Sequence, residues 1–211
     1  MSNSKIIKEA CVGSLSQSLN AEKNGADRLE LCGDLSVGGV TPNYEILAEV
    51  MQQCTIPVKV MIRPRGGSFV HTDAEFEQMK QEVIYCKENG VTEVVFGFLT
   101  PDNQIDVKKT RTLSELASPM QITFHKAIDD TVDILAAVDI LKTIPQITGI
   151  LTSGGCATAT EGIPVLKEMK KRCGEQIALI VAGKVKVDNL AYLHEEIEAQ
   201  EYHGKLIVGE I

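Results

Sequence analysis

The sequence has no tryptophan, and aromatic residues make up only 4% of its 211 residues. Because proteins that bind single-stranded nucleic acid stack the bases on aromatic side chains, this shortage disfavours such a platform. The charge balance agrees with this, since 29 acidic and 21 basic residues leave a net charge of −8 that repels nucleic acid and anionic lipid. We therefore expect neither a nucleic acid nor a membrane as the partner.

Long apolar runs are also missing from the sequence. No window approaches the ~18 uninterrupted apolar residues of a transmembrane helix, and the first five residues contain no apolar stretch of signal-peptide type. We therefore expect a cytoplasmic protein. The apolar content of 44% excludes intrinsic disorder, and the 17 glycines and 7 prolines are too few for a collagen-like or low-complexity chain. The sequence predicts one globular domain over residues 1–211.

The six cysteines form no CxxC pair and have no zinc-finger spacing. In a chain of cytoplasmic character a disulfide framework is improbable as well. Cys54, Cys86 and Cys173 lie near the ends of expected helices, and we interpret them as packing or surface residues.

Short apolar runs rich in β-branched residues alternate with longer amphipathic runs along the whole chain. The starts of successive short runs lie roughly 20 to 35 residues apart, which is the period of a strand-plus-helix unit. Eight such units predict an α/β fold, a (β/α)8 TIM-type barrel, with an open doubly wound sheet as the alternative. The eight expected strands are Ile7–Val12, Arg28–Cys32, Val58–Arg63, Glu93–Phe98, Gln121–Ala127, Ile147–Thr152, Ile177–Ala182 and Lys205–Val208.

Several expected helices have clear start signals. Thr72 with Glu75, and Thr158 with Glu161, have the spacing of a capping box. Thr41-Pro42 precedes a helix expected over 43–53, and Ser14 and Asp188 are candidate N-caps.

The segment after the eighth expected strand is short. A usual barrel of ~250 residues would add a closing helix there, so we expect that helix to be absent or truncated. A second copy of the chain could cover the barrel at this place, and we therefore expect a homo-oligomer.

Charged and titratable residues occur at the ends of several expected strands. Glu9 and Glu30 lie within apolar strand runs, Arg63 and His125 end two further runs, and Asp129 follows shortly after His125. In a barrel the carboxyl ends of the strands carry function, so these residues would meet at one mouth.

Two interpretations of this mouth stay open. Glu9, Glu30 and Arg63 could neutralise one another in an internal ion-pair network, since buried carboxylates are costly without a partner. The cluster could instead form a polar cavity for a small ligand, where His125 adds a group that titrates near neutral pH.

A Glu-x-Cys pattern occurs on two neighbouring expected strands. Residues two apart share one face of a strand, so Glu9 lies with Cys11 and Glu30 lies with Cys32. Because adjacent strands lie ~4.8 Å apart, the two sulfurs could approach each other. Two thiolates suit a soft monovalent ion, and Cu(I) is the natural candidate. Packing of two thiols in the core is the structural alternative, and Cys156 is a weaker third ligand candidate.

Paired glycines precede two expected helices. Gly154-Gly155, and Gly183 with Lys184, could present backbone N–H groups to an anion, at the position where many barrels bind phosphate.

These residues belong to longer stretches that resemble the CutC copper homeostasis proteins. The matching stretches are Glu9–Val12, Gly25–Cys32, Gly38–Pro42, Met61–Gly67, Val95–Thr100, Thr123–Ala127 with Asp129, Leu151–Gly154 and His203-Gly204. The resemblance implies a cytoplasmic (β/α)8 barrel for copper binding and tolerance, often oligomeric, with copper ligation by Cys11 and Cys32. Lys126, Lys184 and Lys205 depart from the family pattern, which usually has Arg, Gly and Ser there.

Two functions follow from the sequence. The first is a copper homeostasis protein that binds or buffers Cu(I) through Cys11 and Cys32. The second is a barrel enzyme acting on a small anionic metabolite, in which His125, Glu9 or Glu30 would be the general acid or base and Arg63 would hold the anion.

Overall fold

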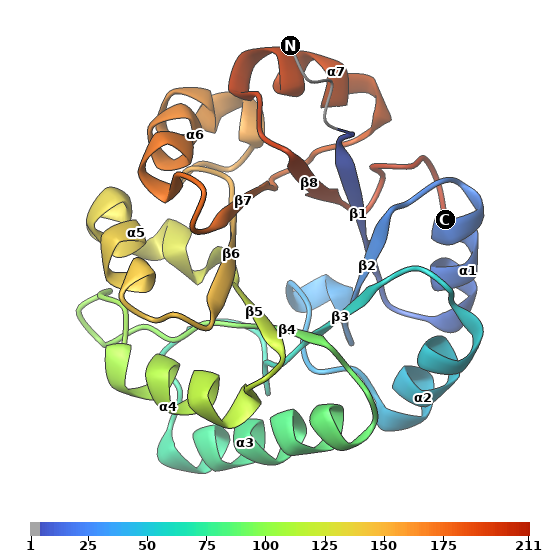
Figure 1. The fold of residues 1–211 in the computed structure, drawn as a ribbon, viewed down its shortest axis with the longest axis vertical. Coiled ribbons are helices and arrows are strands. Elements are labelled where there is room, and N and C mark those ends of the chain that lie inside the picture. The colour runs from blue at the N-terminus through green and yellow to red at the C-terminus, as the bar shows by residue number, and fades with distance from the viewer. Residues whose placement is uncertain (1–4) are drawn as a thin grey trace.

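The computed structural model describes residues 5–211 and shows a ring of parallel strands surrounded by helices (Figure 1). The eight strands close into a barrel in chain order, so the predicted (β/α)8 fold is confirmed and the open sheet is wrong. The strands are β1 (Ile7–Val12), β2 (Arg28–Leu31), β3 (Val58–Met61), β4 (Glu93–Phe96), β5 (Gln121–Phe124), β6 (Ile147–Thr152), β7 (Ala178–Val181) and β8 (Glu201–Gly204).

Seven α-helices of the described chain cover the outside of the barrel (Figure 1). They are α1 (Leu15–Lys23), α2 (Tyr44–Gln53), α3 (Asp73–Glu88), α4 (Val107–Ala117), α5 (Ile134–Lys142), α6 (Ala159–Cys173) and α7 (Val187–Ile197). Two 3-10 helices, η1 (Leu35–Val37) and η2 (Lys126–Asp130), follow β2 and β5. Between residues 5 and 211, no helix combines the length and the apolar character that crossing a bilayer requires.

Most of the helix start signals are confirmed. Thr72 and Thr158 form complete capping boxes at α3 and α6, and the Ser14 hydroxyl caps α1. One N-cap differs from the prediction, because α7 begins after Lys186 and Asp188 lies inside its first turn. The helix expected over 43–53 is α2, and the side chain of Asn43 caps it.

The eighth strand is the main error of the sequence prediction. We expected it at Lys205–Val208, whereas β8 is Glu201–Gly204 and His203 lies within it. The apolar run was misleading because β8 turns polar side chains into the barrel, and Ile207 of the run is buried outside the strand. No helix follows β8 in the described chain. In the segment after it, Leu206 forms a β-bridge with Lys186.

Strand alternation separates two cores. Side chains that point outward from the barrel, such as Val12, Leu31 and Ile62, pack against the helices in one continuous apolar cluster. Inside the barrel, Cys11, Cys32, Met61 and Val95 form a small cluster at one side, and another consists of Leu151, Ile180 and Ala182. The interior is therefore divided between sulfur-rich, apolar and charged regions.

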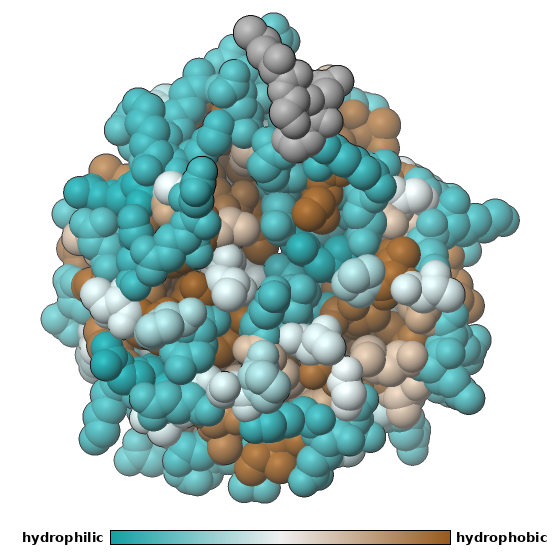
Figure 2. Space-filling view, viewed as in Figure 1, coloured by the Kyte–Doolittle hydropathy of each residue, from teal (hydrophilic) through white to brown (hydrophobic). Residues whose placement is uncertain are grey.

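The surface agrees with the composition. Viewed along the same direction, the molecule is mostly hydrophilic, and apolar side chains lie in separate patches between the helices (Figure 2).

Candidate functional site

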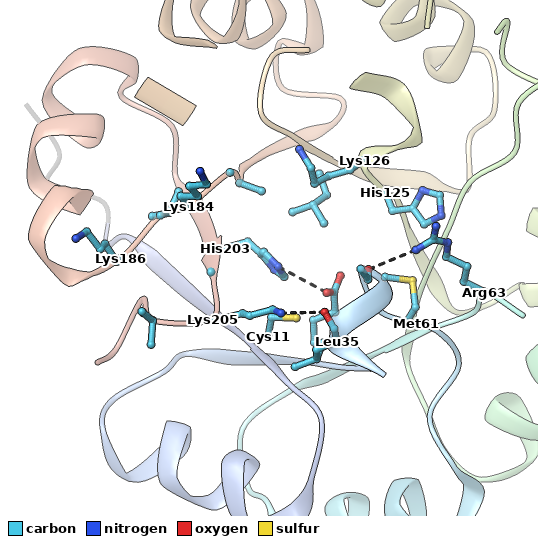
Figure 3. A pocket seen from close by; sticks show the side chains of 18 of the residues that line it. Cys11, Leu35, Met61, Arg63, His125, Lys126, Lys184, Lys186, His203 and Lys205 are labelled. Atoms are coloured by element: carbon cyan, nitrogen blue, oxygen red, sulfur yellow. Dashed lines mark hydrogen bonds and ion pairs between the residues drawn. The ribbon is translucent and has the colours of Figure 1, made fainter. Parts of the chain in front are cut away.

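A cavity of about 580 Å³ opens at the carboxyl ends of the strands (Figure 3). In this view Cys11, His203 and Lys205 lie on one side, and Met61, Arg63 and His125 lie on the other. The charged and titratable residues that line the cavity are Cys11, Glu30, Arg63, His125, Lys126, Lys184, Lys186, His203 and Lys205. Apolar side chains, among them Leu35, Phe69, Leu151 and Leu206, complete the wall.

Glu9 lies beneath this cavity, not in its wall. Its side chain is fully buried, and its Oε2 accepts a hydrogen bond from Arg28 Nε at 2.5 Å. Lys59 Nζ lies 3.4 Å from the same oxygen, and His203 Nδ1 lies 2.8 Å from Oε1. Burial alone would raise the pKa of Glu9, but Lys59, His203 and Arg28 hold it well below its usual value. Glu9 is therefore ionised and orients the His203 ring from behind.

Glu30 and His203 lie next to each other at the floor of the cavity. Glu30 Oε2 is 3.7 Å from His203 Nε2. Burial raises the pKa of Glu30 to about 8, with Cys11 and Glu9 adding to the shift, while His203 opposes it. Burial disfavours the charged form of His203, but Glu30, Cys11 and Glu9 together raise its pKa well above the usual value. The pair therefore holds its protons near neutral pH.

Cys11 and Cys32 meet as the strand pattern predicts. The sulfurs of both cysteines and a carboxylate oxygen of Glu30 all lie within 4.8 Å of one another. Cys32 Sγ donates to Glu30 Oε2 at 3.5 Å. A hydrogen bond with Cys32 lowers the pKa of Cys11 well below its usual value, and the same contact raises the pKa of Cys32. Two buried soft donors therefore lie at the base of the cavity.

Arg63 does not neutralise Glu9 or Glu30, so that part of the ion-pair hypothesis is wrong. Its guanidinium donates to the carbonyl oxygens of Gly39 at 3.0 Å and Gly67 at 2.8 Å. Arg63 lies beyond the end of β3, and its backbone amide donates to Thr41 Oγ1 at 2.9 Å. Among residues 5–211, no carboxylate lies within 4.0 Å of the Arg63 guanidinium.

His125 packs beside Arg63 through Phe69. The Phe69 ring centroid is 4.7 Å from Arg63 Cζ and 4.8 Å from the His125 ring centroid. The amide of Ala127 donates to His125 Nδ1 at 3.2 Å, which leaves the proton of the neutral ring on Nε2. Burial lowers the pKa of His125 to about 3. At neutral pH His125 is therefore a neutral donor, not a group that titrates near pH 7 as expected from the sequence.

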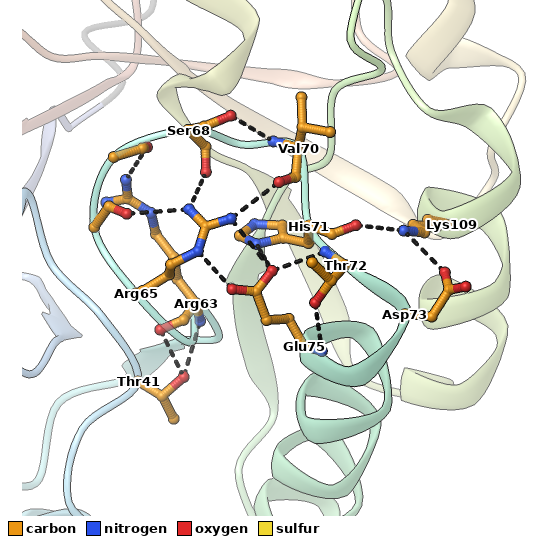
Figure 4. Close-up of polar contacts among 12 residues, drawn as sticks. Thr41, Arg63, Arg65, Ser68, Val70, His71, Thr72, Asp73, Glu75 and Lys109 are labelled. Carbon is orange, nitrogen blue, oxygen red and sulfur yellow. Dashed lines mark hydrogen bonds and ion pairs between the residues drawn. The ribbon is translucent and has the colours of Figure 1, made fainter.

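The loop that carries Phe69 is held by a second arginine (Figure 4). Arg65 Nε donates to Glu75 Oε1 at 2.5 Å and Arg65 also donates to the carbonyl oxygens of Ser68 and Val70. Glu75 in turn closes the capping box of α3 with Thr72. One wall of the cavity is therefore fixed to the start of this helix.

Asp129 does not reach the cavity. Its carboxylate accepts hydrogen bonds from the amides of Ser153 and Gly155 at 3.1 and 2.9 Å, and from Thr152 Oγ1 at 2.5 Å. The anion that the Gly154-Gly155 loop was expected to bind is therefore Asp129 itself. Asp129 fixes the loop after β6 and also pairs with Lys126 at 2.5 Å, which corrects its expected place in the mouth cluster.

Two further expectations have different outcomes. Cys156 is half-buried and belongs to none of the clusters of metal-ligating atoms found among residues 5–211, so the weaker third ligand is not supported. Gly183 and Lys184 do line the cavity, as do Lys126 and Lys205. The three lysines that depart from the family pattern therefore all face this space.

The comparison with known proteins agrees with this geometry. The model of the CutC family matches residues 6–208. The chain belongs to the CutC family. It is 40% identical over 197 residues to the human copper homeostasis protein cutC homolog, a match that covers 93% of this chain and 72% of the human protein. A CutC family protein from Parabacteroides distasonis is 39% identical over 200 residues, which is 94% of this chain and 82% of that protein.

Solved structures show the same architecture. A crystal structure of CutC from Streptococcus agalactiae superposes with a TM-score of 0.91 at 32% identity, and the match covers 96% of this chain and 99% of that chain. A dihydrodipicolinate synthase from Bacillus anthracis has a TM-score of 0.68 at 14% identity, covering 99% of this chain and 72% of that one, and shares the fold alone.

The site of this CutC family chain contains residues that the sequence prediction missed. Arg28 and Lys59 supply the charges that keep Glu9 ionised, and His203 joins Glu30 inside the barrel. A signal was present, because Arg28 lies two residues before Glu30 and therefore shares its strand face. His203 belongs to one of the stretches that carry the family resemblance, but its place inside the barrel depends on the corrected position of β8.

Proposed function

We propose that this chain is a cytoplasmic copper homeostasis protein that binds Cu(I) through Cys11 and Cys32. The observation that carries the proposal is the approach of the two sulfurs to within 4.8 Å in a buried pocket that adjoins an open cavity. Thiolates are the donors that Cu(I) prefers, and two of them suffice for a linear site. The human and bacterial relatives are named copper homeostasis proteins, which supports a role in copper handling for this chain.

The lining supports the proposal in a second way. Cys11 lines the cavity and also a second, smaller pocket, whereas Cys32 is 1% exposed, so copper would reach the pair through Cys11. Met61 and Leu35 pack around the two sulfurs and exclude water, which protects a Cu(I)–thiolate bond from competing ligands.

The test is a Cu(I) titration against a chromophoric chelator under reducing conditions. We expect one Cu(I) per wild-type chain, and loss of this site in Cys11→Ala and Cys32→Ala. Cys173→Ala, which removes a buried cysteine on the opposite side of the barrel, is the matched control. Unchanged stoichiometry and affinity in the first two variants would reject these ligands.

The second candidate function is an enzyme for a small anionic metabolite. It is favoured by the cations around the cavity, above all Arg63, whose charge has no carboxylate partner in the described chain. A buried guanidinium without a counter-charge is costly, and an anionic ligand would supply that charge. Glu30 and His203, whose protons are held near neutral pH, would then be the acid–base pair.

Thermal shift against a panel of small carboxylates and phosphate monoesters tests this second candidate. We expect stabilisation of the wild type by an anion and a smaller shift for Arg63→Ala and His125→Ala. A panel that leaves the melting temperature of the wild type unchanged would count against it. Self-association stays a prediction, which light scattering at micromolar concentration checks.

A further inference from the structure

Two groups of potential metal donors share Glu30 at the floor of the cavity, one formed with Cys11 and Cys32 and the other with Glu9 and His203. Glu30 Oε2 lies 3.5 Å from Cys32 Sγ and 3.7 Å from His203 Nε2. Cys11 Sγ lies within 4.8 Å of both Cys32 Sγ and the Glu30 carboxylate. The Cu(I) site proposed above uses only the two sulfurs and leaves Glu30 and His203 without a role.

The separations from Glu30 suit one tetrahedral ion, and the His203 ring would move toward the two sulfurs to complete it. Zinc binds sulfur at about 2.3 Å, and nitrogen or oxygen at about 2.0 to 2.2 Å, in tetrahedral geometry. The edges of such a tetrahedron are about 3.3 to 3.8 Å long. The Glu30–Cys32 and Glu30–His203 separations already fall in that range, so those donors need little movement to share an ion.

Two independent features of the cluster suit the binding of a metal cation. Glu30 Oε1 is buried and has no hydrogen-bond partner within the described part of the chain, and the residue is 2% exposed. Such an atom is costly unless something pairs with it. In addition, His203 uses Nδ1 to contact the ionised Glu9 at 2.8 Å and directs Nε2 toward Glu30.

The Glu9–His203 contact is the arrangement that metal-binding histidines use. A histidine ligand usually donates its other ring N–H to a carboxylate, which fixes the ring and makes the ligating nitrogen more basic. Arg28 and Lys59 keep Glu9 charged and in place from the opposite side. Glu9 therefore already provides the carboxylate that orients His203 as a ligand.

We propose that Cys11, Cys32, Glu30 and His203 form a four-ligand site for a divalent borderline metal ion, with Zn(II) as the ion that this donor set fits best. Metal binding would release to solvent the protons that Cys32, Glu30 and His203 hold. The resulting two thiolates, one carboxylate and one neutral imidazole are all ligands that Zn(II) accepts. The site shares its two thiolates with the proposed Cu(I) site and thus rests in part on that proposal. It differs in requiring Glu30 and His203, which a linear Cu(I) site does not need.

The first experiment uses the full wild-type chain and Co(II) as a spectroscopic substitute for Zn(II). We expect one Co(II) per chain, with the intense visible bands of tetrahedral cobalt and a thiolate-to-cobalt charge-transfer band. Addition of Zn(II) should abolish both signals. Weak bands of octahedral cobalt, or no thiolate signal, would overturn the proposal without the use of any variant.

The second experiment compares variants by competition of Zn(II) with a chromophoric chelator. Glu30→Gln and His203→Asn should each weaken Zn(II) binding by at least about 10 to 100-fold, while Cu(I) stoichiometry stays at one. Glu77→Gln, an exposed carboxylate on α3, is the control and should change neither. Circular dichroism and thermal melting confirm that each variant is folded.

The outcomes separate the two metal proposals. Equal Zn(II) affinity in the wild type, Glu30→Gln and His203→Asn would refute the four-ligand site while leaving Cu(I) binding intact. A wild-type chain that binds no Cu(I) in the titration would refute the proposed function, independently of the result with Zn(II). Zn(II) binding that disappears in Cys11→Ala, Glu30→Gln and His203→Asn alike would support the further inference.

Discussion

The buried carboxylate of Glu9 allows a sharp test of how the barrel interior is stabilised. Glu9 is 0% exposed and contacts Arg28 at 2.5 Å, Lys59 at 3.4 Å and His203 at 2.8 Å. In Glu9→Gln the shape is kept, but the negative charge is lost and an amide N–H₂ is placed among three donors. Lys59, with a side chain 4% exposed, then keeps Glu93, at 3.2 Å, as its one ion-pair partner among residues 5–211.

The size of the effect follows from burial. Removing one member of a buried ion pair costs about 3 to 5 kcal/mol, because an uncompensated charge remains in the interior. We therefore expect Glu9→Gln to lower the free energy of unfolding by about 4 kcal/mol, which is a large share of the roughly 5 to 15 kcal/mol that holds a typical domain. Urea titration at pH 7, followed by circular dichroism, measures this value.

A matched control separates burial from the simple loss of an ion pair. Glu196→Gln removes the same charge from an exposed pair, in which Glu196 lies 2.8 Å from Lys167. Because exposed pairs contribute about 0 to 1 kcal/mol, little change is expected there. The double variant Glu9→Gln with Lys59→Met should recover part of the lost stability, since it removes both charges. A loss below about 1 kcal/mol in Glu9→Gln, equal to the control, would refute the reasoning.

Three further predictions concern stability. A Cβ on Gly162 would lie 1.9 Å from the carbonyl oxygen of Ser153, so Gly162→Ala should destabilise by more than about 2 kcal/mol by overpacking in urea titrations, whereas a neutral result would contradict the close helix–loop contact. Thr72→Ala removes the cap of α3 and should cost about 1 kcal/mol, which thermal melting detects; an unchanged melting temperature would argue against the capping box. Burial lowers the pKa of His71 to about 4. The unfolded chain protonates His71 near pH 6.5, whereas the folded chain does so only near pH 4. His71 therefore costs no stability above pH 6.5, and the free energy of unfolding falls by about 1.4 kcal/mol per pH unit as the pH drops from 6.5 toward 4. His71→Gln should reduce the pH dependence of the free energy of unfolding by the contribution of one proton. An unchanged pH dependence would show that His71 is not the responsible group.

Much of the architecture could be predicted because it depends on local patterns. The alternation of short β-branched runs with amphipathic runs is a direct consequence of strands buried on both faces and helices buried on one. The first seven strands and the capping boxes at Thr72 and Thr158 are found where these patterns place them. The approach of Cys11 to Cys32 could also be foreseen, since it requires only the two-residue strand period and the pairing of neighbouring strands.

The eighth strand shows where local patterns fail. Glu201–Gly204 has no apolar run because its inward side chains enter a charged interior, and a strand that faces such an interior does not look like a core strand. The apolar residues after it attracted the prediction instead. Ile207 is buried, but it packs at the end of the barrel outside any named strand.

The order of strands and helices, and the presence of acids and thiols on shared strand faces, follow from residues a few positions apart and can be read along the chain. The partners of the charged side chains depend on how the barrel closes. Closure of the barrel pairs β1 with β8 and so brings His203 to Glu9 across most of the chain. In the closed barrel Glu9 forms ion pairs with Arg28 and Lys59. The Arg63 guanidinium donates to a backbone carbonyl, and the Asp129 carboxylate accepts a hydrogen bond from a backbone amide of the loop after β6. The physical reason is that ion pairing inside a barrel depends on height along the axis and on strand register, and neither can be read from the spacing of residues in the chain.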